Sequence, residues 1–235
     1  MRATIKEKRE VAERTLLVTF DLQGERFEWE PGQYFWVELL DPPHDDERGP
    51  RRHITIVTSP TEEAPGLCTR LRDSGFKRSL AELPVGSRVE VEEPKGDFVL
   101  PEATDRAYVF IAGGIGITVF RCMLRYIHDK GLPHRVILVW SNRDRAGAAF
   151  LDEVGELERS NPNLDVVLTM TKDPEWKGES RHVDESMLRD HLDDELGSYT
   201  YFVAGPPDMA VGVGDMLKSA GVPEEQVRVG KFSGY

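Results

Sequence analysis

The sequence predicts two domains, an antiparallel all-β domain followed by a doubly wound α/β domain. Its 235 residues exceed the usual size of one domain. Before residue 104 the apolar runs are short or alternating and are bounded by turn residues. After it, continuous apolar runs alternate with amphipathic helical patterns, which is typical of a parallel sheet covered on both faces. We therefore divide the chain into residues 1–103 and 104–235.

The first half has the strand spacing of a small antiparallel barrel or sandwich. The composition of residues 41–50 is typical of a solvated loop. Residues 76–83 have helical spacing directly after Asp73, Ser74 and Gly75, which favours a single helix among the strands. The expected strands, rich in Val, Thr, Phe and Ile, are residues 15–22, 34–40, 53–58, 66–72 and 88–92.

The second half repeats a strand followed by a helix. We expect the pairs 107–112 with 118–129, 135–140 with 148–160, 164–171 with 185–192 and 201–204 with 208–220, and a final strand at 226–232. Each strand is apolar along its whole length, and each helix has one apolar face. This order of elements predicts the doubly wound parallel sheet.

Charge, cysteines and histidines exclude several classes of protein. The net charge is 30 − 42 = −12, which argues against nucleic acid as the main partner. The start of the chain lacks an apolar leader and no stretch is long enough to span a bilayer, so we expect a cytoplasmic protein without a membrane segment. Cys68 and Cys122 are isolated and the six histidines lack ligand spacing, so we expect no metal site.

A glycine-rich turn joins the first strand of the second half to its helix. Gly113, Gly114 and Gly116 allow a phosphate to approach the backbone, and the helix beginning near Thr118 directs free N–H groups toward it. The turn is not a complete dinucleotide-binding fingerprint, because Val119 stands where a third Gly or Ala is required. A plain glycine turn between strand and helix is the alternative interpretation.

Polar and basic residues follow the next two strands. Ser141, Asn142 and Arg143 offer a hydroxyl, an amide and a guanidinium where an NAD-specific site would place an acid. Lys172 follows the third strand, and we expect it and Arg181 to converge on the same edge of the sheet. Each residue taken alone has the character of a solvated surface group, but together they indicate a site for the 2′-phosphate of NADPH.

The first half offers its own groups to an anionic, phosphate-bearing cofactor. Gln33 and Tyr34 follow a Pro-Gly turn into a strand, Arg52 and His53 begin another strand, and residues 75–79 open the lone helix. Guanidinium, ammonium and helix N-terminus are the groups that bind phosphates.

Five short motifs occur in order along the chain. They resemble the signatures of the ferredoxin-NADP reductase superfamily, from about residue 3 to the last residue. The resemblance implies an FAD-binding six-stranded antiparallel barrel in residues 1–103 and an NAD(P)-binding domain in residues 104–235, with hydride transfer where they meet. The motifs are Arg52-x-Ile54-Thr55, Gly96-x-Phe98 after Pro94, Gly113-Gly114-x-Gly116-x-Thr118, Gly205-Pro206-Pro207-x-Met209 and Phe232-x-x-Tyr235.

The resemblance also implies residue roles. Thr55 matches the hydroxyl near flavin N5, Thr118 the threonine beside the nicotinamide, and Tyr235 the aromatic residue stacked on the flavin, which together form the catalytic set. Arg52 matches the arginine on the flavin pyrophosphate. The expected cofactor-binding residues are Gln33, Tyr34, Arg52, His53, Ile54, Thr55, Val57, Thr58, Gly75, Phe76, Lys77, Arg78, Ser79, Gly113, Gly114, Gly116, Thr118, Ser141, Asn142, Arg143, Lys172, Arg181, Gly205, Pro206, Pro207, Met209, Phe232 and Tyr235.

Four positions depart from the family's pattern. Ile54 replaces the Tyr or Phe that stacks on the flavin, and Lys77 stands where many members have Ser or Thr. Val119 replaces a common Pro, and Ala204 replaces a Cys near the nicotinamide. Without that cysteine, catalysis would rest on positioning and a dry cleft rather than on a side-chain acid or base.

The expected protein is a monomeric flavoenzyme resembling ferredoxin-NADP and flavodoxin-NADP reductases. It would transfer hydride between NADPH and FAD and pass single electrons to a protein carrier, ferredoxin or flavodoxin. One alternative is an NAD(P)H reductase for free flavin, a ferric chelate or a partner oxygenase. Another is a non-catalytic electron-transfer subunit, an interpretation that Ile54 keeps open.

Overall fold

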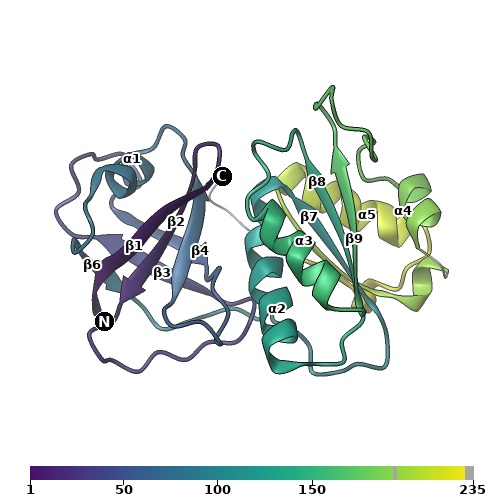
Figure 1. Ribbon diagram of the computed structural model, residues 1–235, viewed down its shortest axis with the longest axis horizontal. Helices are drawn as coiled ribbons and strands as arrows, with labels where there is room; N and C mark the ends of the chain where they lie inside the picture. The colour runs from purple at the N-terminus through teal and green to yellow at the C-terminus, as the bar shows by residue number, and fades with distance from the viewer. Residues whose placement is uncertain (193–194, 231–235) are drawn as a thin grey trace.

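The computed structural model describes residues 1–192 and 195–230 of the chain. Figure 1 shows two lobes side by side, the first built from strands and the second from a sheet flanked by helices. One sheet has six strands and the other has five. The expected architecture, an antiparallel barrel-like sheet followed by a doubly wound α/β sheet, is confirmed.

Six antiparallel strands make up the first sheet: β1 (Arg2–Ala12), β2 (Thr15–Asp21), β3 (Tyr34–Leu39), β4 (Arg51–Thr55), β5 (Gly66–Arg70) and β6 (Arg88–Val91). Their order is β4-β3-β6-β1-β2-β5, and the edge strands β4 and β5 contact each other, so the sheet curls toward a barrel. Two register shifts in β1 assist this bending. Phe20, Phe35, Val37 and Val89 fill the interior with no exposed surface.

One helix, α1 (Gly75–Glu82), interrupts these strands as expected. The Ser74 side chain caps it by accepting a hydrogen bond from the Lys77 backbone N–H at 3.2 Å. Phe76 and Leu80 are buried in the core of the barrel. The apolar face of α1 therefore fixes the position of its N-terminus relative to β4 and β5.

The second sheet is parallel, in the order β11-β10-β7-β8-β9. Its strands are β7 (Tyr108–Gly113), β8 (Val136–Asn142), β9 (Leu164–Met170), β10 (Thr200–Ala204) and β11 (Val227–Val229). Its helices are α2 (Ile117–Lys130), α3 (Leu151–Ser160), α4 (Glu185–His191) and α5 (Pro207–Ser219), and short 3-10 turns occur at Gly114–Gly116, Leu196–Ser198 and Glu224–Gln226. Phe110 and Trp140 pack toward α2 and α3, while Ile111 and Val139 pack toward α4 and α5.

The two lobes share an apolar interface. Phe98 follows the last barrel strand, yet its ring centroid lies 5.0 Å from that of Phe202 and 6.3 Å from that of Phe120 in the second domain. Leu17 and Val57 of the first lobe belong to the same hydrophobic cluster. The interface therefore holds the ends of both sheets close together.

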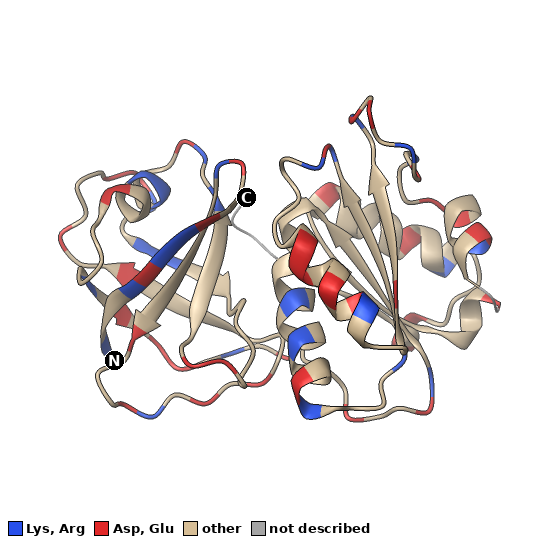
Figure 2. Ribbon diagram, viewed as in Figure 1, with Lys and Arg blue, Asp and Glu red and all other residues tan. Residues whose placement is uncertain are grey.

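Charged residues are interspersed over both lobes, with basic residues on α1 and acidic residues on α3 (Figure 2). No described helix combines the length and apolarity needed to cross a bilayer. Across residues 1–192 and 195–230, no three side chains of metal-binding type are grouped as a metal site would require.

Several element boundaries differ from the sequence expectations. Strand β1 was not among the expected strands, because only Ala3 and Ile5 of its residues are fully buried and charged residues surround them. Helix α3 begins at Leu151 rather than 148, because Phe150 before it adopts a left-handed backbone with φ of 66°. The final strand ends at Val229, and residues 231 and 232 of the expected strand lie outside the described part.

Candidate functional site

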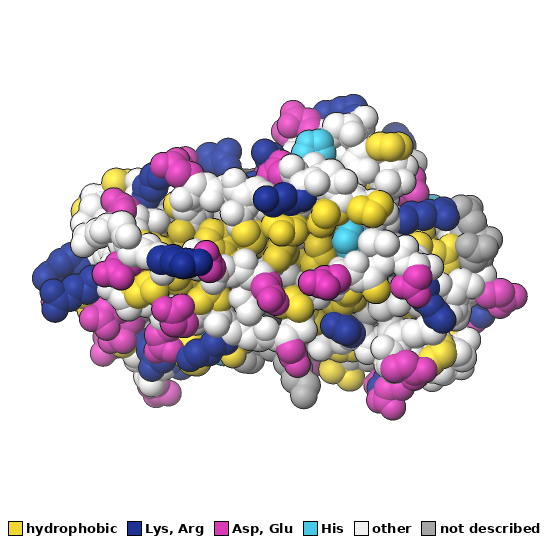
Figure 3. All heavy atoms as spheres, turned by 90° about the horizontal axis from the view of Figure 1, so that it is seen from below, with side chains coloured by type: hydrophobic (Ala, Val, Ile, Leu, Met, Phe, Trp, Pro, Cys, Tyr) yellow, Lys and Arg dark blue, Asp and Glu magenta, His cyan; other side chains and the backbone are white. Residues whose placement is uncertain are grey.

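A cavity of about 840 Å³ lies where the barrel meets the carboxyl ends of the parallel strands. Figure 3 shows apolar side chains gathered along the middle of one face of the molecule, where the lobes join, with charged groups around them. Both domains line the cavity. The sequence-predicted residues in its wall are Tyr34, Arg52, His53, Ile54, Thr55, Phe76, Lys77, Gly113, Gly114, Gly116, Thr118 and Pro206.

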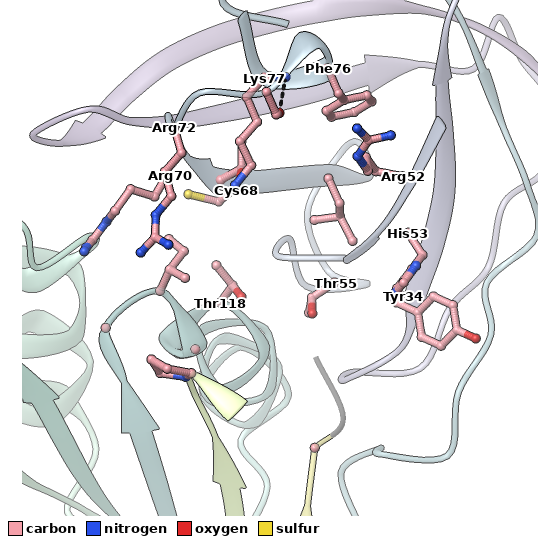
Figure 4. Close-up of a pocket in the computed structure, with 18 of the residues that line it drawn as sticks. Tyr34, Arg52, His53, Thr55, Cys68, Arg70, Arg72, Phe76, Lys77 and Thr118 are labelled. Carbon is pink, nitrogen blue, oxygen red and sulfur yellow. Dashed lines mark hydrogen bonds between the residues drawn. The ribbon is translucent and has the colours of Figure 1, made fainter. Parts of the chain in front are cut away.

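Two hydroxyls come to the cavity from opposite walls (Figure 4). Thr55 ends β4 and is 6% exposed, and Thr118 lies in the first turn of α2 and is 7% exposed. Gly116, which precedes α2, offers no side-chain cap, and the Ile117 N–H donates to the Gly114 carbonyl of the preceding 3-10 turn. The arrangement gives a planar ligand one hydroxyl from each domain.

The three positions of the turn require glycine for different structural reasons. A Cβ at Gly116 would lie 2.3 Å from the carbonyl oxygen of Ala204, and a Cβ at Gly113 would lie 2.5 Å from the Met209 sulfur. Gly114 has a left-handed φ of +52° and nothing within 4 Å of where its Cβ would be. Gly116 therefore allows close packing against the end of β10 and Gly113 allows close packing against α5, while Gly114 leaves open space at the cavity.

Aromatic residues flank the β3–β4 wall. The His53 ring contacts Tyr34 and Trp36 edge to face, at centroid distances of 5.6 and 4.9 Å. The Arg51 guanidinium lies 4.5 Å from the centroid of the Trp36 ring on its outer side. Burial lowers the pKa of His53, with a further contribution from the charge of Arg48. Both effects disfavour the protonated form of His53.

Arg52, expected on the pyrophosphate, is held by the chain itself. Its Nη1 donates to the carbonyl oxygens of Arg48, Gly49 and Arg51 at 2.6 to 3.0 Å. Its Nη2 donates to both carboxylate oxygens of Asp46, at 2.9 and 3.0 Å. Burial alone would raise the pKa of Asp46, but its bonds from Arg52 and from backbone N–H groups lower it.

Lys77 and several arginines form a basic cluster in the same cavity. We define the cluster as Lys77, Arg48, Arg70 and Arg72, all of which line the wall. Figure 4 shows the Lys77 and Arg70 side chains reaching into the cavity beside Cys68. Burial lowers the pKa of Lys77 to about 8, assisted by the charges of Arg72, Arg48, Arg52 and Arg70. Such a concentration of like charge at a cavity favours an anionic ligand.

The residues expected on a 2′-phosphate lie at the β8–β9 edge and do not line the cavity. Arg143 and Lys172 are exposed and adjacent, because the Lys172 N–H donates to the Arg143 carbonyl at 2.7 Å. Asn142 is buried, and neither polar atom of its side chain has a hydrogen-bond partner in the described structure. Ser141 lies beside it as the penultimate residue of β8. Four of the expected residues, Ser141, Asn142, Arg143 and Lys172, thus lie at one edge.

Arg181 does not offer a free guanidinium to this edge. It forms ion pairs with Glu179 at 2.5 Å and Asp190 at 2.8 Å. The hydrogen bond from Arg181 strongly lowers the pKa of Glu179. Arg145 is paired in the same way with Asp173, and that hydrogen bond lowers the pKa of Asp173 to about 2. Asp144, next to Arg143, accepts a hydrogen bond from the Gly147 N–H at 2.8 Å.

A family model described as an oxidoreductase NAD-binding domain matches residues 110–215. The structure superposes on the flavohemoprotein-like FAD/NAD binding domain of nitric oxide dioxygenase from Vibrio cholerae with a TM-score of 0.82, at 16% identity, covering 96% of this chain and 95% of that one. The chain therefore has the two-domain fold of ferredoxin-NADP reductase-like proteins, and most of its second domain matches the NAD-binding family model. The resemblance seen in its ordered motifs is thus confirmed.

The curated relatives that the chain matches are longer proteins. A flavohemoprotein from Burkholderia sp. is 28% identical over 94% of this chain and 56% of its own length. The reductase component DmpP of phenol 2-monooxygenase from Pseudomonas sp. is 30% identical over 77% of this chain and 51% of its own length. The chain spans about half the length of the curated relatives it matches.

The other expected residues within the described part of the chain do not line the cavity. Gln33 accepts a hydrogen bond from the Glu30 N–H, and Ser79 exchanges hydrogen bonds with the His44 backbone. The Thr58 carbonyl accepts hydrogen bonds from Trp29 and Cys122. Val57, Gly75, Arg78, Gly205, Pro207 and Met209 are likewise absent from the described lining. Phe232 and Tyr235 lie outside the described residues.

The sequence reasoning missed Asp46, Arg48, Arg70 and Arg72, all of which line the cavity. A sequence signal existed for two of them, because Arg70 and Arg72 stand at the end of an expected strand and alternate with Leu71. No local pattern signalled Asp46, because its partners Arg52 and Gly75 are reached only by folding the loop onto α1.

Proposed function

We propose that this chain is a flavin-dependent NAD(P)H reductase with FAD in the cavity. The observation that carries the proposal is one cavity walled by both domains, with Thr55 and Thr118 on opposite sides and a basic cluster at one end. A volume of about 840 Å³ suits a large organic ligand. Flavin, when bound, accepts hydride from a nicotinamide and releases electrons one at a time.

The residues present fit such a cofactor. Arg70 lines the cavity, and its Nε is buried without a hydrogen-bond partner in the described structure, as expected of a donor that awaits an anion. Gly114 leaves open space in front of the α2 N-terminus. In the proposal Thr55 and Thr118 orient the reacting rings, and Ile54 excludes water from one face. The assignment of Tyr235 to the other face rests on the family resemblance.

Among the pyridine nucleotides, we propose NADPH as the preferred donor. Arg143 and Lys172 supply the cations for a 2′-phosphate, and their backbones are joined by a hydrogen bond at the sheet edge. Arg181, held by two carboxylates, contributes little in this proposal. The division into an FAD-binding domain of residues 1–103 and an NAD(P)-binding domain of residues 104–235 belongs to the same proposal.

The proposed acceptor is a one-electron protein carrier, ferredoxin or flavodoxin. A second candidate is the oxygen-binding component of an oxygenase or globin, because the relatives include a monooxygenase reductase component and a flavohemoprotein. Both candidates need the same reductase chemistry from this chain and differ only in the partner that docks beside the cavity.

The test is reconstitution with FAD followed by anaerobic mixing with NADPH. We expect noncovalent binding of one flavin, with an oxidised band near ~450 nm that bleaches on reduction. Reoxidation by ferredoxin, flavodoxin and a catalytic oxygenase component then ranks the acceptors. A protein that binds no flavin would overturn the proposal.

A further inference from the structure

Helix α2 is joined to the segment that follows β4 by hydrogen bonds that cross between the domains. Figure 1 shows α2 on the side of the second lobe that faces the first. The Arg121 Nη1 donates to the Val57 carbonyl at 3.3 Å and to the Glu62 carboxylate. The Cys122 Sγ donates to the Thr58 carbonyl at 3.0 Å. These bonds attach the first half of α2 to one short stretch of the barrel domain.

Arg121 is the centre of these contacts. Its side chain is only 6% exposed, and its Nη2 also pairs with Glu153 of α3 at 2.6 Å. Its guanidinium lies 5.5 Å from the centroid of the Phe150 ring, directly before α3. Glu62 is held in turn by its own loop, because its carboxylate accepts from the Ser59 N–H at 2.6 Å. One guanidinium therefore connects the barrel domain with two helices of the second domain.

The two segments that Arg121 connects also carry the two hydroxyls of the cavity. Thr118 lies three residues before Arg121, on the same side of α2. Thr55 ends β4, two residues before Val57. Both threonines line the cavity, from opposite walls. The Arg121 contacts therefore determine how the wall that carries Thr118 is placed relative to the wall that carries Thr55.

The apolar part of the interface does not fix this placement by itself. Leu17, Phe98 and Phe202 pack across it, and hydrophobic attraction has no preferred direction. Replacing a buried ion pair by well-packed apolar side chains is often neutral for stability, so stability alone does not call for an arginine here. A guanidinium differs from an apolar side chain because it donates hydrogen bonds in a fixed planar arrangement. Its specific contribution at this interface is orientation.

We infer that Arg121 is a positioning residue for hydride transfer, because it sets the separation and angle of the two cavity walls between which the nicotinamide and the flavin react. The inference rests on the proposed function. In that reaction a C4–H bond of NADPH breaks, its hydride with both electrons bonds to flavin N5, and NADP⁺ leaves. Arg121 is absent from the described lining of the cavity, so it acts through the position of the walls. A misplacement of about 1 Å can slow such a step about 100-fold.

The first measurement is the rate constant of flavin reduction at saturating NADPH, by anaerobic stopped flow. In Arg121→Met we expect it to fall about 10- to 100-fold, with unchanged dissociation constants for FAD and NADPH, because geometry and not binding is altered. NADPH deuterated at C4 shows that the slowed step is the hydride transfer. Arg125→Met is the matched control: Arg125 lies one turn further along α2, pairs with Asp129 of the same helix at 2.9 Å, and should leave the rate constant unchanged.

The second measurement needs no cofactor. Spin labels on Glu25→Cys in the barrel domain and Glu156→Cys in α3 report the distance between the domains by double electron–electron resonance. Both positions are exposed, whereas the two native cysteines are buried. In the apoprotein we expect Arg121→Met to broaden the distribution of distances and Arg125→Met to keep the wild-type width.

A folded Arg121→Met with the wild-type rate constant, or with the wild-type distribution of distances, would overturn the inference. If Arg121→Met does not fold, Glu62→Gln replaces it in both measurements, because it weakens the pair that crosses between the domains and leaves Glu153 in place. The same two results in Glu62→Gln would then overturn the inference. Failure of the wild-type protein to bind any flavin would instead overturn the proposed function.

Discussion

The two basic regions of the molecule differ in how their cations are neutralised. At the β8–β9 edge, Arg145 and Arg181 are each paired with two carboxylates. In the cavity, Lys77 and Arg70 project from α1 and β5 without such partners among the described residues. Under the proposed function, the cations without carboxylate partners are the ones that face the ligand, whereas the paired cations hold the chain in place. The comparison therefore distinguishes the two kinds of cation by their partners and not by charge alone.

The most consequential paired cation is Arg121 of α2, which joins the two domains. Its side chain is 6% exposed and pairs with Glu62 of the first lobe and with Glu153 of α3, the latter at 2.6 Å. Arg121→Met leaves both carboxylates without their cation, so we expect a loss of about 3–5 kcal/mol in unfolding free energy. Urea denaturation followed by circular dichroism measures it. A loss below about 1 kcal/mol would show that paired cations here are not structural.

The next effect concerns the pyridine nucleotide. In the double variant Arg143→Ala, Lys172→Ala we expect the KM for NADPH to rise roughly tenfold or more, with the KM for NADH unchanged, because only NADPH has the 2′-phosphate. Arg181→Ala should change the KM for NADPH less than about threefold, because its guanidinium is engaged by Glu179 and Asp190. Steady-state kinetics with NADPH and NADH measures these KM values. An equal rise in the KM for NADPH in the double variant and in Arg181→Ala would contradict the distinction.

The smallest expected effect is on how the stability of the apoprotein depends on pH. Burial and the neighbouring arginines lower the pKa of Lys77 to about 8 from 10.5. Between these values the unfolded chain binds more protons than the folded one, so Lys77 makes folding more favourable as pH rises from 8 to 10.5.

In Lys77→Met that contribution disappears. We expect the variant apoprotein to melt about 2–4 °C above wild type at pH 7, with the gap closing as pH rises. Scanning calorimetry from pH 7 to 9.5 checks this, with Lys130→Met as the control for surface charge. A gap that is constant with pH would mean that Lys77 is not the titrating group.

The fold could be predicted where the local pattern is set by burial. Strand β7 is buried at every position, so its continuous apolar run indicated a central parallel strand. Strand β1 could not be found in this way, since its register is fixed by pairing with β2 and β6 rather than by its own side chains. The start of α3 at Leu151 could not be predicted either. It depends on the left-handed backbone of Phe150, a conformation that bulky residues rarely adopt.

The site was predictable in its residue types more than in its contacts. Thr55, Thr118 and Gly114 could be read from motifs, because each sits at the end of a strand or the start of a helix. The pairing of Arg52 with Asp46 could not, because it depends on the path of a whole loop. A motif therefore identifies a side chain but not whether its donors are available.

Phe98 has a consequence for the modularity of this chain. It belongs by sequence to the barrel, yet its ring packs between Phe120 and Phe202 of the other domain, beside Leu17 and Val57 in one cluster. Cutting the chain after residue 103 would expose these apolar side chains on the surface of each fragment, where they would favour aggregation. The two domains therefore cannot be exchanged independently. A chimaera that joins either domain to one from another protein would also need residues that pack against its side of the interface formed by Phe98, Phe120 and Phe202.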